Sequence, residues 1–278
     1  MSLGNILTVA EKEMLESIRN RWLTTFAVVF GLLALLISFF GLSALGLRGY
    51  QGFNRVTASL LNLVLYLLPL IALVMGAYSV AGERESGSLH VLLTHPVHPG
   101  EVIMGKFLGV ALALVAAIFS GFGGAGVVMA WKTGVLYLGD YLVFVGLSVG
   151  LALIFLSLAI LISVISTRRA QALGLAIFVW FVIILVYDFL AIGVAALQQV
   201  TLVVPLLLAL LLLNPADMVR VLVILQLGGE ATFGPTLAAL TRVLSAGSGE
   251  ALLLVVLALW MILPLAVAAL WFSRRQDY

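Results

Sequence analysis

Six apolar segments, each long enough to cross a lipid bilayer as an α-helix, make up more than half of this chain of 278 residues. A spanning helix needs about 20 apolar residues, because each residue adds only about 1.5 Å to its length. Charged residues are 9% of the chain, whereas soluble domains carry about 25%. We therefore expect an all-α integral membrane protein that forms one transmembrane domain over residues 1–278. The predicted spans are residues 23–47, 56–82, 107–131, 140–166, 171–195 and 250–272.

The distribution of Lys and Arg predicts the orientation of these spans, because cytoplasmic loops are enriched in both residues. With the N-terminus inside, nine basic residues lie on the inner side and five on the outer side. We therefore expect both termini in the cytoplasm. The inner residues are Lys12, Arg19, Arg21, Arg84, Lys106, Arg168, Arg169, Arg274 and Arg275, and the outer ones are Arg48, Arg55, Lys132, Arg220 and Arg242.

The first 22 residues predict an amphipathic helix that lies in the membrane interface. At about 100° per residue, apolar side chains between Leu3 and Trp22 share one face of a helix over residues 5–22, and polar side chains lie opposite. Such a helix rests on the membrane rather than crossing it, with Trp22 at the level of the lipid headgroups.

Residues 83–106 form a polar, charged segment between two long apolar runs. Charged side chains stand at both ends of this segment, and an apolar stretch fills its middle. A short surface helix of this composition predicts a docking element for a soluble partner protein. The charged residues are Glu83, Arg84, Glu85, Glu101 and Lys106, and the apolar ones include Leu89, Leu92 and Leu93.

Residues 196–249 are too long for a passive connection, since most connections have about 4–6 residues. Their apolar stretch, residues 200–213, is too short to span a bilayer and contains Pro205, so we expect a re-entrant or interfacial helix. Counting it as a seventh span would move Arg274 to the outer side. Asn214 before Pro215 predicts a turn between two short helices.

Asp188 is the ionisable residue that lies deep in a predicted span. A carboxylate at the centre of a bilayer costs about 2.5–3.5 kcal/mol on insertion scales. Asp188 either lines a gate or lies near the outer end and reaches water, and these alternatives remain open. Its expected partners are an outer Arg side chain or Tyr187.

Three short motifs resemble catalytic signatures but occur in unsuitable surroundings. Residues 100–106 match most of a phosphate-binding loop, but Phe107 replaces the hydroxyl residue that holds magnesium, and no strand precedes it. Residues 121–126 match a dinucleotide-binding pattern inside an apolar span, where small residues allow close helix packing. Residues 146–150 match a serine-hydrolase elbow, also within a span. We predict no catalytic site and no bound cofactor.

Two further classes of site are excluded or disfavoured by the composition. The chain has no cysteine, which excludes disulfides and thiolate metal sites, and its net charge of +2 is too small to indicate nucleic-acid binding. His95 and His98 are separated by Pro96 and followed by Pro99, so no helix aligns them. We therefore expect His90, His95 and His98 to be surface residues rather than a metal site.

The charged segment resembles the cytoplasmic signature of type-2 ABC permeases, and the resemblance covers nearly the whole chain. The amphipathic start, with Glu13, Arg19 and Arg21, looks like the elbow helix of that family, and Leu210–Leu222 looks like its Asn-Pro turn before the last span. The residues that match the signature, which this resemblance assigns to coupling with an ATPase, are Glu83, Arg84, Glu85, Gly87, Leu89, Leu92, Leu93, Pro96, Glu101 and Lys106.

This resemblance implies partners as well as a fold. Members of the family resemble one another in forming homodimers in a bacterial inner membrane, in contact with lipid and with two cytoplasmic ATPases that hold ATP and magnesium. On the outer side of the membrane we expect a periplasmic accessory protein and a gate. The gate residues are Asp188, Asn214, Asp217 and Arg220.

Within the family, three segments are similar to the permeases that serve the maturation of nitrous-oxide reductase: Arg19–Trp22, Val179–Leu190 and the Asn-Pro segment. That resemblance implies delivery of a sulfur-containing factor for assembly of a copper–sulfide centre. Two alternatives stay open. One is an exporter of lipid, glycan or drug, and the other is a scaffold that transmits force to a periplasmic partner.

Overall fold

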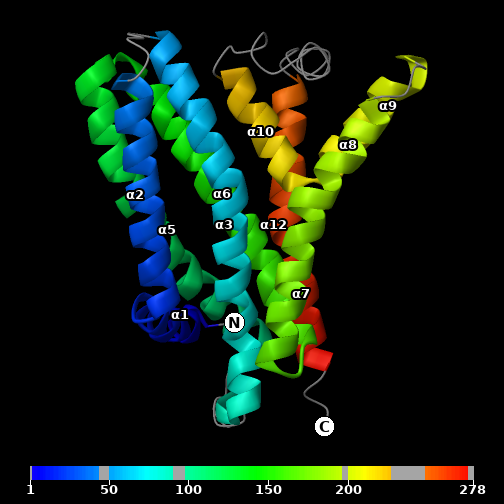
Figure 1. Cartoon of the computed structure of the whole chain (residues 1–278). Coiled ribbons are helices and arrows are strands. Elements are labelled where there is room, and N and C mark those ends of the chain that lie inside the picture. Colours follow the sequence, from blue (N-terminus) through cyan, green and yellow to red (C-terminus); the bar gives the residue numbers. More distant parts are fainter. Residues whose placement is uncertain (1, 44–49, 90–97, 196–199, 227–247, 275–278) are drawn as a thin grey trace.

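The computed structural model describes residues 2–43, 50–89, 98–195, 200–226 and 248–274. Within these residues the chain is helical and contains no strand, which confirms the predicted all-α class (Figure 1). The α-helices are α1 (Leu3–Ile18), α2 (Arg21–Ser43), α3 (Tyr50–Ser86), α5 (Pro99–Thr133), α6 (Leu138–Ile165), α7 (Arg169–Phe181), α8 (Tyr187–Ala195), α9 (Val200–Leu213), α10 (Pro215–Gln226) and α12 (Ser248–Arg274). A 3₁₀ turn, η1 (Val135–Tyr137), precedes α6, and a π-helix, η2 (Val182–Val186), joins α7 to α8.

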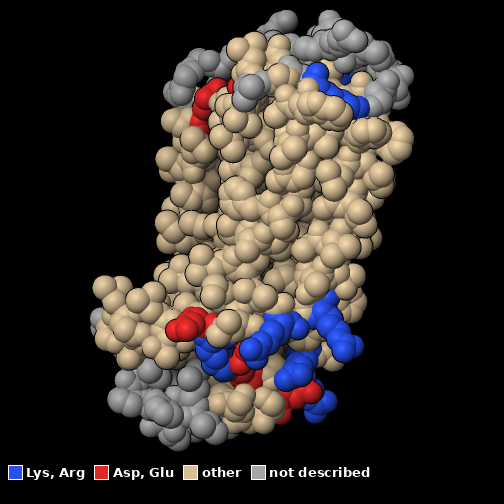
Figure 2. Space-filling view, turned by 90° about the vertical axis from the view of Figure 1, so that its left-hand side faces the viewer, with Lys and Arg blue, Asp and Glu red and all other residues tan. Residues whose placement is uncertain are grey.

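Six spans in the described part of the chain are long and apolar enough to cross a membrane, as predicted. They are α2, α3, α5, α6, the continuous α7–η2–α8 unit and α12. On the face that Figure 2 shows, a broad belt without charge separates two ends at which charged side chains gather. Because α1 and the last residues of α12 lie at the same end (Figure 1), we call it the α1 end and the opposite one the far end.

Two spans extend further than the apolar pattern indicated. α3 continues to Ser86 and α5 begins at Pro99, so the charged ends of the 83–106 segment belong to these two long helices. They do not form a separate surface helix, because the helices persist after the apolar residues end. Residues 90–97 lie outside the described residues, and Leu92, Leu93, Pro96, His90 and His95 lie there.

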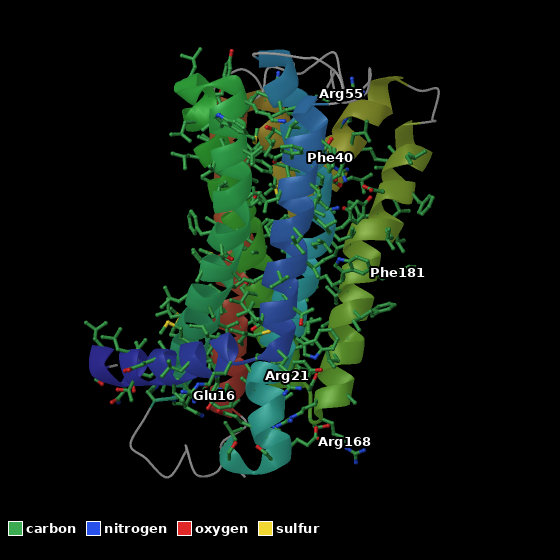
Figure 3. All side chains as sticks on the ribbon, turned by 60° about the vertical axis from the view of Figure 1, so that its left-hand side comes forward. Glu16, Arg21, Phe40, Arg55, Arg168 and Phe181 are labelled. Carbon is green, nitrogen blue, oxygen red and sulfur yellow. The ribbon has the colours of Figure 1, made fainter. Side chains whose placement is uncertain are left out.

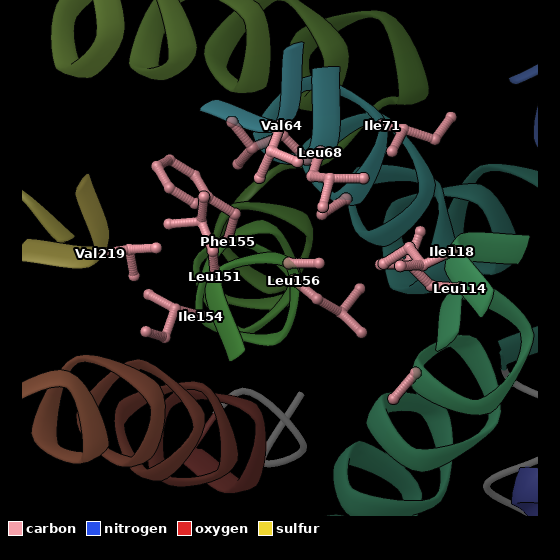
Figure 4. Packing of buried hydrophobic residues seen from close by; sticks show 14 of the residues in the cluster. Val64, Leu68, Ile71, Leu114, Ile118, Leu151, Ile154, Phe155, Leu156 and Val219 are labelled. Carbon is pink, nitrogen blue, oxygen red and sulfur yellow. The ribbon is translucent and has the colours of Figure 1, made fainter. Parts of the chain in front are cut away.

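The core of the bundle surrounds α6, which packs against α3, α5, α10 and α12. Figure 4 shows α6 at the centre of this core, with Phe155 on the side of Val64 of α3 and Val219 of α10, and Leu156 on the side of Ile118 of α5. Gly76 of α3 permits this packing, because a Cβ atom there would lie 2.5 Å from Cβ of Ala159. Predicted close packing at the glycine-rich pattern is also confirmed: Gly121 has room for no side chain beside Phe30.

α1 lies across the α1 end of the bundle rather than along it (Figures 1 and 3). Most of the apolar face predicted from the sequence is exposed, including Leu3, Leu7 and Ile18, whereas Ala10 on the same face is buried. The predicted helix over 5–22 is interrupted, since α1 ends at Ile18 and α2 begins at Arg21. Oδ1 of Asn20 accepts a hydrogen bond of 2.9 Å from the Trp22 N–H, and this side-chain bond starts the new helix.

α9 and α10 form the re-entrant segment that the sequence predicted. Their axes bend by 110° at Asn214, between Pro205–Leu213 and Pro215–Gln226. α9 descends from the far end into the bundle and α10 returns to the same end (Figure 1). α12 therefore starts at the far end and ends at the α1 end.

Candidate functional site

A buried ion network joins three helices at the α1 end. The Lys106 side chain of α5 is fully buried, and its Nζ lies 2.9 Å from Oε2 of Glu13 and 3.0 Å from Oε2 of Glu83. Nζ also donates a hydrogen bond of 2.9 Å to the carbonyl of Ser79. One ammonium group thus holds α1, α3 and α5 together. Breaking a buried pair by removing one partner typically costs about 3–5 kcal/mol.

Lys12 extends this network to the surface. Its Nζ lies 2.7 Å from Oε1 of Glu83 and 3.7 Å from Oε1 of Glu16. Burial alone lowers the pKa of Lys12, but the hydrogen bond and charge of Glu83 outweigh this effect and raise the pKa above its usual value. For Glu13, burial raises the pKa of the carboxyl group despite the nearby Lys106.

Two glycines of α5 let α1 approach closely enough for these contacts. A Cβ atom on Gly105 would lie 2.6 Å from Cβ of Val9, and one on Gly109 would lie 2.7 Å from Cβ of Glu13. The motif that resembles a phosphate-binding loop is therefore the first two turns of α5, packed against α1. Its lysine is the buried Lys106, which faces carboxylates.

Glu101 fastens the beginning of α1 to the beginning of α5. Its carboxylate accepts hydrogen bonds from the backbone N–H of Ser2 (2.5 Å) and from Nδ2 of Asn5 (2.9 Å). It also accepts one of 3.1 Å from the N–H of His98, while Nδ1 of His98 accepts one of 3.2 Å from Gly100. This reciprocal arrangement caps α5 and gives His98 a structural role.

Arg84 and Glu85 connect the end of α3 to the loop between α6 and α7. Nη1 of Arg84 donates to the carbonyls of Val164, at 3.0 Å, and of Ser166. Oε2 of Glu85 accepts a hydrogen bond of 2.6 Å from the backbone N–H of Arg169. Both side chains satisfy helix ends that would otherwise lack partners.

The described residues assigned to ATPase coupling thus divide into internal and exposed groups. Leu89 is buried in the core, and the charged side chains bond within the chain. The exposed turn at the end of α3 is centred on Gly87 and flanked by the exposed Ser86 and Ser88, and Gly87 has the positive φ of 79° that favours glycine. Arg19 and Arg21 of the predicted elbow helix are exposed on either side of the break at Asn20.

The four residues expected at the outer gate meet around the turn of the α9–α10 hairpin. Nη1 of Arg220 lies 2.8 Å from Oδ1 of Asp217 and 3.2 Å from Oδ1 of Asp188. Asp188 is thus paired with an outer arginine, which is one of the two partners expected for it. The hydroxyl of Tyr187 instead donates a hydrogen bond of 3.1 Å to the carbonyl of Leu210 in α9.

Asn214 fixes the turn of the re-entrant hairpin and is only 2% exposed. Its Nδ2 donates to the carbonyl of Ile183 at 3.0 Å and to Oδ2 of Asp217 at 2.9 Å. Its Oδ1 accepts a hydrogen bond of 2.9 Å from the N–H of Ala216. Asn214 therefore joins the hairpin to the α7–η2–α8 span.

The acceptor of this bond belongs to the π-helix, which the sequence did not predict. In η2 the N–H of Tyr187 bonds the carbonyl of Val182, five residues earlier. A return to the four-residue spacing of an α-helix skips the next carbonyl, that of Ile183. Asn214 supplies the missing partner. A run of Val and Ile carries no signal for this irregularity.

The described residues form six spans, a crosswise N-terminal helix and a re-entrant hairpin, and they include no soluble domain. This architecture is that of a membrane-embedded transport subunit. The chain belongs to the ABC-2 transporter family, because the family described as ABC-2 family transporter protein matches residues 7–276. It is therefore a multi-pass permease subunit of an ABC transporter, a class of subunit that lacks its own catalytic site.

Two curated relatives match almost the whole chain. The protein named "Probable ABC transporter permease protein NosY" from Pseudomonas aeruginosa strain PAO1 is 36% identical over 274 residues, covering 97% of this chain and 98% of that protein. The protein of the same name from Stutzerimonas stutzeri is 33% identical over 280 residues, covering 98% of this chain and 99% of that protein.

Proposed function

We propose that this permease works with a separate cytoplasmic ATPase dimer and delivers a sulfur-containing factor for the copper–sulfide centre of nitrous-oxide reductase. The observation that carries the proposal is the 36% identity, over nearly the full length of both chains, to a permease named NosY. The active unit is a homodimer that also contacts a periplasmic accessory protein.

In this proposal, force from the ATPase enters at the α1 end. The exposed turn at Ser86–Ser88 lies at the end of α3. Because Lys106 bonds to Glu13 and Glu83, a push on this turn acts on α1, α3 and α5 together. In this proposal the charged side chains make a rigid block, and the exposed turn makes the contact.

α3 carries the displacement through the membrane. Its 37 residues extend about 55 Å at 1.5 Å per residue. Oγ of Ser163 on α6 accepts hydrogen bonds from the N–H groups of Val80 and Ala81, at 3.0 and 2.9 Å. Further along, Nε1 of Trp180 on α7 donates to the carbonyl of Tyr66 at 3.0 Å. α3 is thus bonded to α6 and to α7.

The hairpin at the far end is the gate in this proposal. Asn214 bonds to η2, and Arg220 bonds to Asp188 just beyond it. A displacement of α7 relative to α10 therefore changes these polar contacts before it changes the apolar core. Residues 196–249, of which 200–226 and 248–249 are described, would receive the periplasmic partner.

A chromosomal deletion tests the assignment. Cells without this chain should still export the copper reductase but lack its copper–sulfide centre, which optical and EPR spectra of the purified reductase report. Expression of the wild-type chain should restore the centre. A fully assembled centre in the deletion strain would reject the nitrous-oxide assignment and favour an exporter of lipid, glycan or drug, or a force-transmitting scaffold of another system.

A further inference from the structure

A cavity of about 490 Å³ opens at the α1 end, between α1, α3 and the beginning of α7. Figure 3 shows this region, with Glu16 on α1 and Arg168 at the start of α7 on the two sides of α3. Charged side chains line the cavity together with the apolar Met75 and Val110. The cavity is thus lined by both charged and apolar side chains. A ligand with a charged group and a hydrocarbon part could contact both.

A buried hydroxyl group in the cavity wall lacks a partner. Ser79 is only 6% exposed, it lines the cavity, and its Oγ makes no hydrogen bond with the described residues. Ser79 lies seven residues before the end of α3, or about 10 Å inside that end. An unsatisfied buried polar group costs about 1–3 kcal/mol, but Oγ has less than 1 Å² of accessible surface, so a ligand in the cavity does not reach it unless the wall shifts.

The rim offers charge of both signs. The Arg169 guanidinium donates one hydrogen bond, from Nη2 to the carbonyl of Gly82 at 3.1 Å, and forms no ion pair with a described carboxylate. The Glu16 carboxylate is 60% exposed and lies 3.7 Å from Lys12, whose shorter contact is with Glu83. Arg169 can therefore bind an anionic group while Glu16 binds a cationic one.

A metal ion fits this cavity poorly. Carboxylate oxygens of Glu13, Glu16 and Glu83 lie within 4.8 Å of one another, but Lys106 and Lys12 already neutralise two of them. A ligand that carries its own positive and negative groups matches the rim better.

We propose that this cavity binds the headgroup of phosphatidylethanolamine. The phosphate faces Arg169, the ammonium group faces Glu16, and the hydrocarbon lies against Met75 and the exposed ring of Trp22. The ammonium carries N–H donors that can bond the Glu16 carboxylate, whereas a trimethylated headgroup carries none. The site therefore selects phosphatidylethanolamine over phosphatidylcholine.

The experiment measures which lipid the full-length chain retains. The protein is placed in nanodiscs of equal parts phosphatidylethanolamine, phosphatidylcholine and phosphatidylglycerol, and is then transferred to mild detergent for native mass spectrometry. We expect retained phosphatidylethanolamine in clear excess over the other two lipids. Arg169→Gln and Glu16→Gln should each lower its retention about tenfold, which corresponds to about 1.4 kcal/mol.

Neighbouring residues provide matched controls. Arg168→Gln and Glu11→Gln remove the same charges from exposed positions outside the cavity lining and should leave lipid retention unchanged. Thermal unfolding of each variant identifies any that fail to fold. Equal retention of the three lipids, preference for phosphatidylglycerol, detergent alone in the cavity, or equal losses in test and control variants would each overturn the proposal.

Discussion

Nζ of Lys106 and Oε2 of Glu13 lie 2.9 Å apart although 93 residues separate them in the chain. The pair connects a helix that lies across the bundle to one that crosses the membrane, and both side chains are withdrawn from solvent. α1 is therefore held by charge in a protein that is stabilised mainly by apolar packing.

Replacing Lys106 with Met should destabilise the purified protein by about 3–5 kcal/mol, because Glu13 and Glu83 would face each other without a counter-ion. Thermal unfolding in detergent measures the effect. Neutralising both carboxylates as Gln in the same chain should restore much of the stability. Lys132→Met, at the far end, is the control, and an equal loss in both single variants would contradict this interpretation.

Stability should depend on pH through Glu13. Burial raises the pKa of this carboxyl group above its usual value of 4.5, so the folded state binds the proton more tightly than the unfolded state. The associated stability is present below pH 4.5 and is lost as pH rises through the higher pKa of the folded protein. Glu13→Gln should therefore gain stability relative to wild type across this window, and Glu11→Gln should not. A constant difference at all pH values would reject the assignment.

Labelling of single cysteines tests the topology, since the chain has none of its own. Ser88 at the α1 end and Leu136 at the far end are both exposed. In intact cells an impermeant maleimide should label Leu136→Cys once the outer membrane is opened, while Ser88→Cys should react only after lysis. The opposite pattern would place both termini outside and remove the proposed ATPase contact.

Arg220→Gln should impair reductase maturation more than it impairs folding. The variant leaves Asp188 and Asp217 without their shared cation at 3.2 and 2.8 Å, which weakens the link between α8 and α10. Spectra of the copper–sulfide centre in complemented deletion cells measure the effect, with protein abundance as the check on folding. Arg55→Gln, at an exposed far-end position, should support normal maturation. Normal centres in both strains would exclude Arg220 from the gate.

Asn214→Ala should cost about 2–4 kcal/mol, because it removes three side-chain hydrogen bonds of about 0.5–1.5 kcal/mol each and leaves the carbonyl of Ile183 without a partner. Thermal unfolding measures the loss. Asn54→Ala, on α3, serves as a comparison outside the hairpin. Unchanged stability in Asn214→Ala would mean that the hairpin turn is held by other contacts.

Apolar length and the Lys and Arg pattern were sufficient to predict six spans and a re-entrant hairpin, because both depend on local composition. The same reasoning found Asp188 and Arg220, since ionisable residues are conspicuous in apolar surroundings. It did not find that Glu83 points inward, because its partners Lys12 and Lys106 come from two other helices. Charge in the sequence marks where a helix leaves the bilayer, but only tertiary packing decides whether that charge meets solvent or another side chain.

Helix boundaries were predicted less well for a related reason. Hydropathy changes at residue 82, whereas hydrogen bonding continues to Ser86. The break between α1 and α2 does have a local signal, since Asn20 is a residue that favours helix starts. The π-helix has none, because its cause lies in the contact with Asn214.

The π-helix and Asn214 depend on each other, so evolution should keep or lose them together. η2 contains one residue more than regular α-helical spacing needs. As a result, the carbonyl of Ile183 has no partner within the helix, and it accepts a hydrogen bond from Asn214 instead. Deleting one residue from Val182–Val186 would remove the need for the asparagine but rotate Asp188 by about 100° around the helix. Losing the asparagine alone would leave a buried acceptor without a donor. We therefore expect relatives to keep the extra residue and the asparagine together, or to lack both.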